Sequence, residues 1–97
     1  MPHYVSLLRY TAQGITKVKD SPSRLDAARK AAESMGGKIH SWYLTMGHHD
    51  AVIIAEFPSD EVCAKFMLSV SSLGNITTQT LKAFNEAEYR KIISSLP

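Results

Sequence analysis

Two strand-like segments follow each other closely in the middle of the chain. They are KIHSWYLTM at 38–46 and DAVIIAEF at 50–57, and only Gly47-His48-His49 separates them. A connection of this length joins antiparallel strands into a β-hairpin. The chain is therefore restricted to folds that contain at least one antiparallel strand pair at the centre of the sequence.

A strand and a helix are expected before this hairpin. Residues 3–10, HYVSLLRY, are rich in aromatic and aliphatic side chains, which is typical of a strand. Ser21-Pro22 has the form of a helix N-cap followed by proline at the first helical position. The apolar stripe of this helix is Leu25, Ala28, Ala32 and Met35. Gly36-Gly37 ends it, and its two alanines predict that the helix packs closely on the sheet.

A helix, a strand and a last helix are expected after the hairpin. Ser59 can cap the first of these helices, and its apolar stripe is Val62, Phe66, Val70 and Leu73. Residues 76–84, ITTQTLKAF, are β-branched and strand-like. Asn85 and Glu88 are spaced as a capping box for the C-terminal helix.

The resulting order, β-α-β-β-α-β plus a C-terminal helix, predicts one α+β domain over residues 1–97. It is the order of the ferredoxin-like fold, with a four-stranded antiparallel sheet and both main helices on one face. A chain of 97 residues buries a modest core, so self-association is an accessible way to bury more surface.

The loop length of the hairpin decides which side chains share a face, because a slip of one residue exchanges the two faces. An even loop aligns Trp42, Leu44 and Met46 with Ala51, Ile53, Ala55 and Phe57. An odd loop would mix apolar and polar residues and would bury Glu56 beside His40. We favour the even loop, because it offers the helices a wholly apolar face.

The opposite face is expected to be closed by a second copy of the chain. With Val5 and Leu7 directed at the helices, Leu8, Val52 and Ile54 lie on this open face, which is too apolar to stay bare. These three residues are the predicted homodimer interface. Polar neighbours would line a small-molecule cavity between the paired sheets. The predicted lining residues are Tyr4, Ser6, Tyr43, Thr45, Asp50, Glu56, Thr78 and Thr80.

Composition excludes several other classes. The formal net charge of +2 is too small to indicate nucleic acid, and no apolar run approaches the roughly 20 residues of a membrane span. The N-terminal residues lack the features of a signal peptide. The single cysteine, Cys63, lies in a helical apolar pattern, which favours a packing role and a reducing, cytoplasmic location.

Three runs of the chain resemble the GYD-domain proteins of bacteria and archaea. They are GITKVKDSPSRLDAARKAAESMGGKI, YLTMGHHDAVIIAE and SLGNITTQTLKAFNEAEYRKII, which together cover nearly the whole chain. The resemblance implies a dimeric α/β barrel, whose broader superfamily includes cofactor-independent monooxygenases, haem-degrading enzymes and ligand-sensing domains. Gly47 and Asp50 match the naming Gly-Tyr-Asp motif, whereas His49 stands where the family usually has tyrosine.

The turn itself carries little chemical signal. Adjacent histidines on an extended chain point to opposite sides, and no metal-binding spacing is present, so His48 and His49 are expected to be solvent-exposed and no metal or other cofactor is expected. Gly47 is expected to adopt a positive φ. Asp50 is expected to accept a backbone N–H or to face the cavity.

Three functions remain open from the sequence. The first is a homo-oligomeric domain that binds a small molecule without catalysis. The second is a cofactor-independent oxygenase- or isomerase-like enzyme that uses Tyr43, Glu56 or His49, with Glu56 as a base of raised pKa or, alternatively, as a partner of a lysine or arginine. The third is a purely structural interaction module.

Overall fold

The computed structural model describes residues 1–97. In chain order its elements are β1 (His3–Tyr10), α1 (Ala12–Thr16), a 3-10 turn η1 (Val18–Asp20), α2 (Ser21–Ser34), β2 (Lys38–Leu44), β3 (Ala51–Glu56), α3 (Asp60–Ser71), β4 (Ile76–Ala83) and α4 (Glu86–Ser94). The predicted order is confirmed. The short segments α1 and η1 occupy the connection between β1 and α2.

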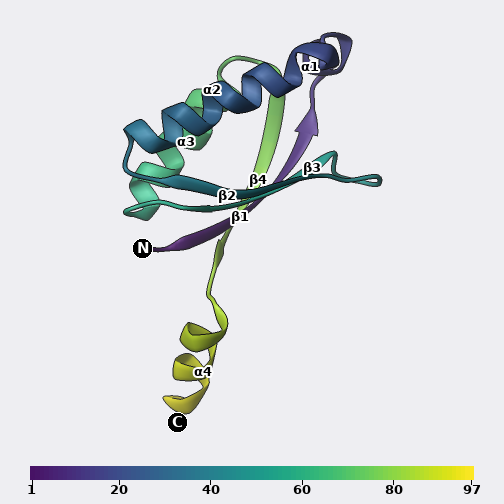
Figure 1. The fold of residues 1–97 in the computed structure, drawn as a ribbon. Helices are drawn as coiled ribbons and strands as arrows, with labels where there is room; N and C mark the ends of the chain where they lie inside the picture. Colours follow the sequence, from purple (N-terminus) through teal and green to yellow (C-terminus); the bar gives the residue numbers. More distant parts are fainter.

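The four strands form one antiparallel sheet in the order β2-β3-β1-β4. Figure 1 shows α2 and α3 together on one side of this sheet, whereas α4 projects away beyond the other side. The ferredoxin-like α+β fold is thereby confirmed. None of the helices combines the length and the apolar character that crossing a membrane requires.

The helix starts follow the expected capping chemistry. The Ser59 hydroxyl accepts a hydrogen bond from the Val62 N–H, and Asn85 and Glu88 form the reciprocal capping box at the start of α4. α2 differs slightly from the prediction. It begins at Ser21 itself, because η1 leads directly into it, and Asp20 stands at the cap position without a side-chain hydrogen bond.

The even-loop register of the hairpin is confirmed. Trp42 pairs with Ile53 and Leu44 pairs with Ala51, so the apolar sets of β2 and β3 share the face under the helices. Leu44 and Met46 nevertheless lie beyond the reach of the helices and are exposed. The core lies between α2, α3 and the centre of the sheet, with Phe57 and Phe66 among its largest fully buried side chains.

The predicted orientation of β1 is wrong. Tyr4, Ser6 and Leu8 are buried under the helices, where they pair with Ala55, Ile53 and Ala51. Leu8 is therefore a core residue of one subunit, and the open face carries Val5 and Leu7 in its place. The strand is apolar on both faces, so alternation alone did not distinguish them.

The same correction applies to β4. Thr78 pairs with Leu8 and Thr80 with Ser6, which places both threonines on the helix side of the sheet. Thr77, Gln79 and Leu81 therefore occupy the open face. The hydroxyl groups of the buried strand residues have hydrogen-bond partners nearby. The Ser6 and Thr80 hydroxyls are 2.9 Å apart, and the Ser6 hydroxyl also donates to Met67 Sδ at 3.7 Å.

Candidate functional site

The open face of the sheet carries an apolar centre that no element of the chain covers. Strand alternation and the pairing of neighbours assign it Val5 and Leu7 from β1, Tyr43 from β2, Val52 and Ile54 from β3, and Leu81 from β4. The exposed fractions of Ile54, Leu81 and Tyr43 are 36%, 45% and 59%. A one-sided antiparallel sheet ordinarily has a polar outer face. This face therefore has the composition of an interaction surface.

A polar cluster lies at one end of the open face. Glu56 Oε1 is 2.6 Å from His3 Nε2, and Glu56 Oε2 is 3.2 Å from His40 Nε2. The two imidazole rings are stacked, with centroids 6.5 Å apart. His40 reaches this side because the β2–β3 register shifts between Ile39 and Ser41, as in a β-bulge. The cluster thus joins three strands through one carboxylate.

The pKa of Glu56 is lowered from its ordinary value of 4.5. The hydrogen bond with His40 is the largest cause, desolvation opposes it, and the charges of His3 and His40 add to the lowering. The hypothesis of a raised pKa is therefore wrong, and so is the alternative of a lysine or arginine partner. An ionised Glu56 serves as a hydrogen-bond acceptor and weighs against a general base tuned to neutral pH.

His3 has an unused hydrogen-bonding atom. Its Nδ1 is buried and has no hydrogen-bond partner, and the nearest carboxylate oxygen, Glu88 Oε1, lies 3.9 Å away. That oxygen accepts a hydrogen bond from the Asn85 N–H within the capping box. An unpaired buried nitrogen is rare in a folded protein. This atom is the one buried side-chain nitrogen or oxygen in the chain without a hydrogen-bond partner.

The polar residues of the hairpin turn make hydrogen bonds that hold the turn in place. Asp50 Oδ2 accepts a hydrogen bond from the Tyr10 N–H at 2.9 Å, and the Thr45 hydroxyl donates to the His49 carbonyl at 2.6 Å. Gly47 has φ +152°, as expected for this turn. Asp50 and Thr45 therefore tie the loop to itself and to β1. The structure places neither of them beside the Glu56 cluster.

Tyr4, another predicted lining residue, belongs to a separate network on the helix side. Its hydroxyl donates to the Asp60 carboxylate, which also accepts from Lys82 Nζ at 3.1 Å. Burial raises the pKa of Tyr4, and the hydrogen bond and charge of Asp60 raise it further. Of the eight predicted lining residues, Tyr43 and Glu56 lie on open-face positions of the strands, whereas Tyr4, Ser6, Thr78 and Thr80 lie on the helix side. Thr45 and Asp50 lie at the hairpin turn.

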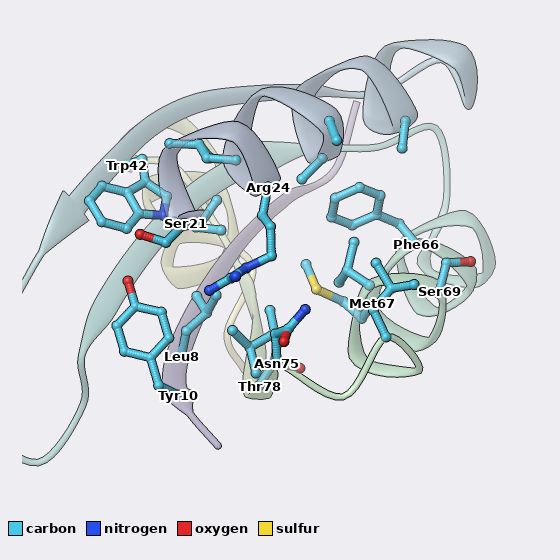
Figure 2. Close-up of a pocket in the computed structure, with 18 residues that line it drawn as sticks. Leu8, Tyr10, Ser21, Arg24, Trp42, Phe66, Met67, Ser69, Asn75 and Thr78 are labelled. Carbon is cyan, nitrogen blue, oxygen red and sulfur yellow. The ribbon is translucent and has the colours of Figure 1, made fainter. Parts of the chain in front are cut away.

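A cavity that sequence reasoning missed lies on the helix side, between α2 and α3 (Figure 2). Its volume is about 340 Å³, and 13 of its 18 lining residues are hydrophobic. Ala27, Ala28 and Ala31 form part of the α2 wall. The prediction that alanines bring the helix close to the sheet holds for Ala32, which is fully buried, but the other alanines leave space unfilled.

The chain matches the family described as GYD domain over residues 4–93. It belongs to the GYD domain family. The chain is similar to the "Glutamine synthetase and cystathionine beta-lyase binding protein" of Thermus thermophilus. It is 27% identical over 89 residues, which cover 91% of this chain and 94% of the relative.

Solved structures with the same fold support the architecture of this GYD domain. FFRP-DM1 has a TM-score of 0.63 at 15% identity, covering 87% of this chain and all of that one. The leucine response regulatory protein LrpA of Mycobacterium tuberculosis has a TM-score of 0.57 at 15% identity, covering 87% of this chain and 51% of that one. TTHA0845 from Thermus thermophilus has a TM-score of 0.56 at 21% identity, covering 88% of this chain and 95% of that one.

Proposed function

We propose that this GYD domain works as a homo-oligomeric binding module whose open sheet face pairs with that of a second copy. The observation that carries the proposal is the uncovered apolar centre formed by Val5, Leu7, Val52 and Ile54 on the two middle strands. Pairing removes this apolar surface from water at roughly 25 cal/mol per Å². It also leaves the helices outside, where they remain free to contact other proteins.

Pairing would bring the Glu56 cluster to the edge of an enclosed space. Glu56 offers a carboxylate, flanked by the imidazoles of His3 and His40. Tyr43 adds a phenol from β2 on the same face. A small polar molecule held between two sheets would find both hydrogen-bond donors and acceptors there. The proposed small-molecule site is therefore the space between the paired sheets.

The relative from Thermus thermophilus is named for binding two enzymes. By analogy, we propose that this chain acts by binding and regulating other proteins, and we assign it no catalytic step. The analogy supplies only the class of activity, because 27% identity does not carry over the choice of partner.

A matched pair of substitutions tests the self-association. Ile54→Asp places a charge in the proposed interface, whereas Leu68→Asp places the same charge on the exposed side of α3, where Leu68 is 71% exposed. Size-exclusion chromatography with light scattering should give a smaller species for Ile54→Asp and an unchanged oligomer for Leu68→Asp. An unchanged oligomer for both variants would reject the open face as the interface.

Native mass spectrometry of the unmodified protein tests the small-molecule part. Protein purified without denaturation should show a subpopulation with added mass, and this added mass should be missing from the Ile54→Asp variant. Retention of the added mass by a monomeric Ile54→Asp variant would place the molecule outside the paired sheets.

A further inference from the structure

The cavity between α2 and α3 has the size of a ligand site. Its volume of about 340 Å³ falls within the roughly 300–1,000 Å³ of small-molecule pockets. Packing voids in protein interiors are ordinarily little larger than a water molecule. The space exists because small residues of α2 face large residues of α3 across it, among them Phe66 and Met67. The floor includes Leu8, Trp42 and Ile53 from the sheet.

The cavity has few polar groups, and only one of them is charged. Its lining contains one charged residue, Arg24, and no aspartate or glutamate. The other polar lining groups are neutral, and they come from Tyr10, Ser21, Ser69, Asn75 and Thr78. An apolar space with one positive group favours a ligand that has an apolar body and one negative group.

Arg24 is held in place but its charge is not neutralised. Its Nη1 donates to the Lys17 carbonyl at 3.1 Å and its Nη2 donates to the Gly14 carbonyl at 3.3 Å. These two bonds leave three of the five N–H donors of a guanidinium free. Arg24 takes part in none of the ion pairs of the chain. In Figure 2 its side chain extends from α2 toward the end of the cavity where Tyr10 and Asn75 lie.

We propose that this cavity binds a monocarboxylic acid with an apolar tail. The tail lies along the apolar walls of α2 and α3, and the carboxylate accepts hydrogen bonds from the free N–H groups of Arg24. Tyr10 and Asn75 are among the neutral polar residues that line the cavity. The site lies within one subunit and on the helix side of the sheet, so it does not depend on pairing of the open faces.

Fluorescence of Trp42 tests the proposal directly, because Trp42 is the single tryptophan and lines the cavity. Titration of the full chain with decanoate should give a saturable change in emission. Decan-1-ol, which has the same tail without the charge, should bind at least about tenfold more weakly, since hydrogen bonds to a charged group are stronger than neutral ones. Acetate, which has the charge without the tail, should give no saturable change.

Two variants separate the charge from the space. Arg24→Met should weaken decanoate binding at least about tenfold and leave the affinity for decan-1-ol unchanged. Lys30→Met, which removes an exposed charge from the same helix, should change the affinity for neither probe. Ala31→Leu fills the cavity and should abolish binding of both probes without lowering the melting temperature. Equal decanoate affinity in Arg24→Met and Lys30→Met would overturn the proposal, as would a decanoate titration of the unmodified chain that does not saturate.

The Ile54→Asp variant should still bind decanoate. The test of the cavity is therefore independent of whether the open sheet faces pair.

Discussion

Glu56 and His3 stand directly opposite each other in the β3–β1 ladder, and their side chains meet at 2.6 Å on the open face of the sheet. His40, from the irregular segment of β2, contacts the other oxygen of the same carboxylate. Three strands are therefore connected at one end of a surface whose centre is apolar. The proposed interface therefore has an apolar centre at Val52 and Ile54 and a polar end at Glu56.

The Glu56 cluster should make stability depend on pH in the acid range. Because the pKa of Glu56 in the folded chain is lowered from 4.5, its ionised form stabilises the fold above that value. This stabilisation is lost as the pH falls through the folded-state pKa. Glu56→Gln should therefore have a lower melting temperature than the unmodified chain at pH 7, and the difference should shrink below about pH 4.5.

Thermal denaturation between pH 3 and pH 7 measures this difference. Glu61→Gln, an exposed carboxylate in the first turn of α3 that joins no ion pair, serves as the control and should show no comparable pH dependence. A constant difference between Glu56→Gln and the unmodified chain across the whole range would contradict the role assigned to the ionised carboxylate.

The exposed apolar side of α4 should contribute to self-association. Tyr89, Ile92 and Ile93 of α4 and Leu96 just beyond its end are all exposed, and no residue of α4 is buried. Figure 1 shows α4 beyond the side of the sheet that α2 and α3 leave open, where a second copy would lie. The double substitution of Ile92 and Ile93 by serine should weaken the oligomer and leave the unfolding free energy of the dissociated subunit within about 0.5 kcal/mol of the original.

Sedimentation velocity over a range of concentrations and urea denaturation provide these two readings. Leu68→Ser, which changes an exposed leucine of α3, is the matched control and should leave the oligomer intact. If the double variant assembled as well as the control, α4 would have no part in the interface.

Cys63 should be unreactive in the folded chain. Burial raises the pKa of its thiol to about 11, and the nearby charge of Asp60 adds to this, so very little thiolate is present at pH 8. Ellman's reagent should therefore react slowly with the native protein and should release one equivalent per chain in urea. Fast labelling of the native protein would show instead that Cys63 is accessible and would refute its role as a packing residue.

The arrangement of the elements could be predicted because each carries its own local signal. Ser59 and Asn85 are capping residues, and the sharp contrast between Ile53 and Glu56 on alternating positions sets the register of the hairpin. β1 has no such contrast, because Tyr4 and Leu8 on one face are as apolar as Val5 and Leu7 on the other. Its orientation follows from pairing with β3 and from the Tyr4–Asp60 hydrogen bond. Both are contacts between residues far apart in the sequence.

The Glu56 cluster escaped prediction for a related reason. Strict alternation places His40 and Glu56 on opposite faces in the even-loop register, and only the irregularity between Ile39 and Ser41 brings them together. The cavity depends on the distance between α2 and α3, which no periodic pattern encodes. Its one sequence signal is the run of alanines at 27, 28, 31 and 32 in α2, too short to cover the sheet beneath.

The molar mass of the unmodified chain in solution tests the central claim most directly. If a second copy covers the apolar centre of the open face, as proposed, sedimentation equilibrium at tens of micromolar and neutral pH should give a whole-number multiple of the 10.7 kDa subunit, at least two. A mass of 10.7 kDa that did not change with concentration would contradict it, since Val52 and Ile54 would then face only water.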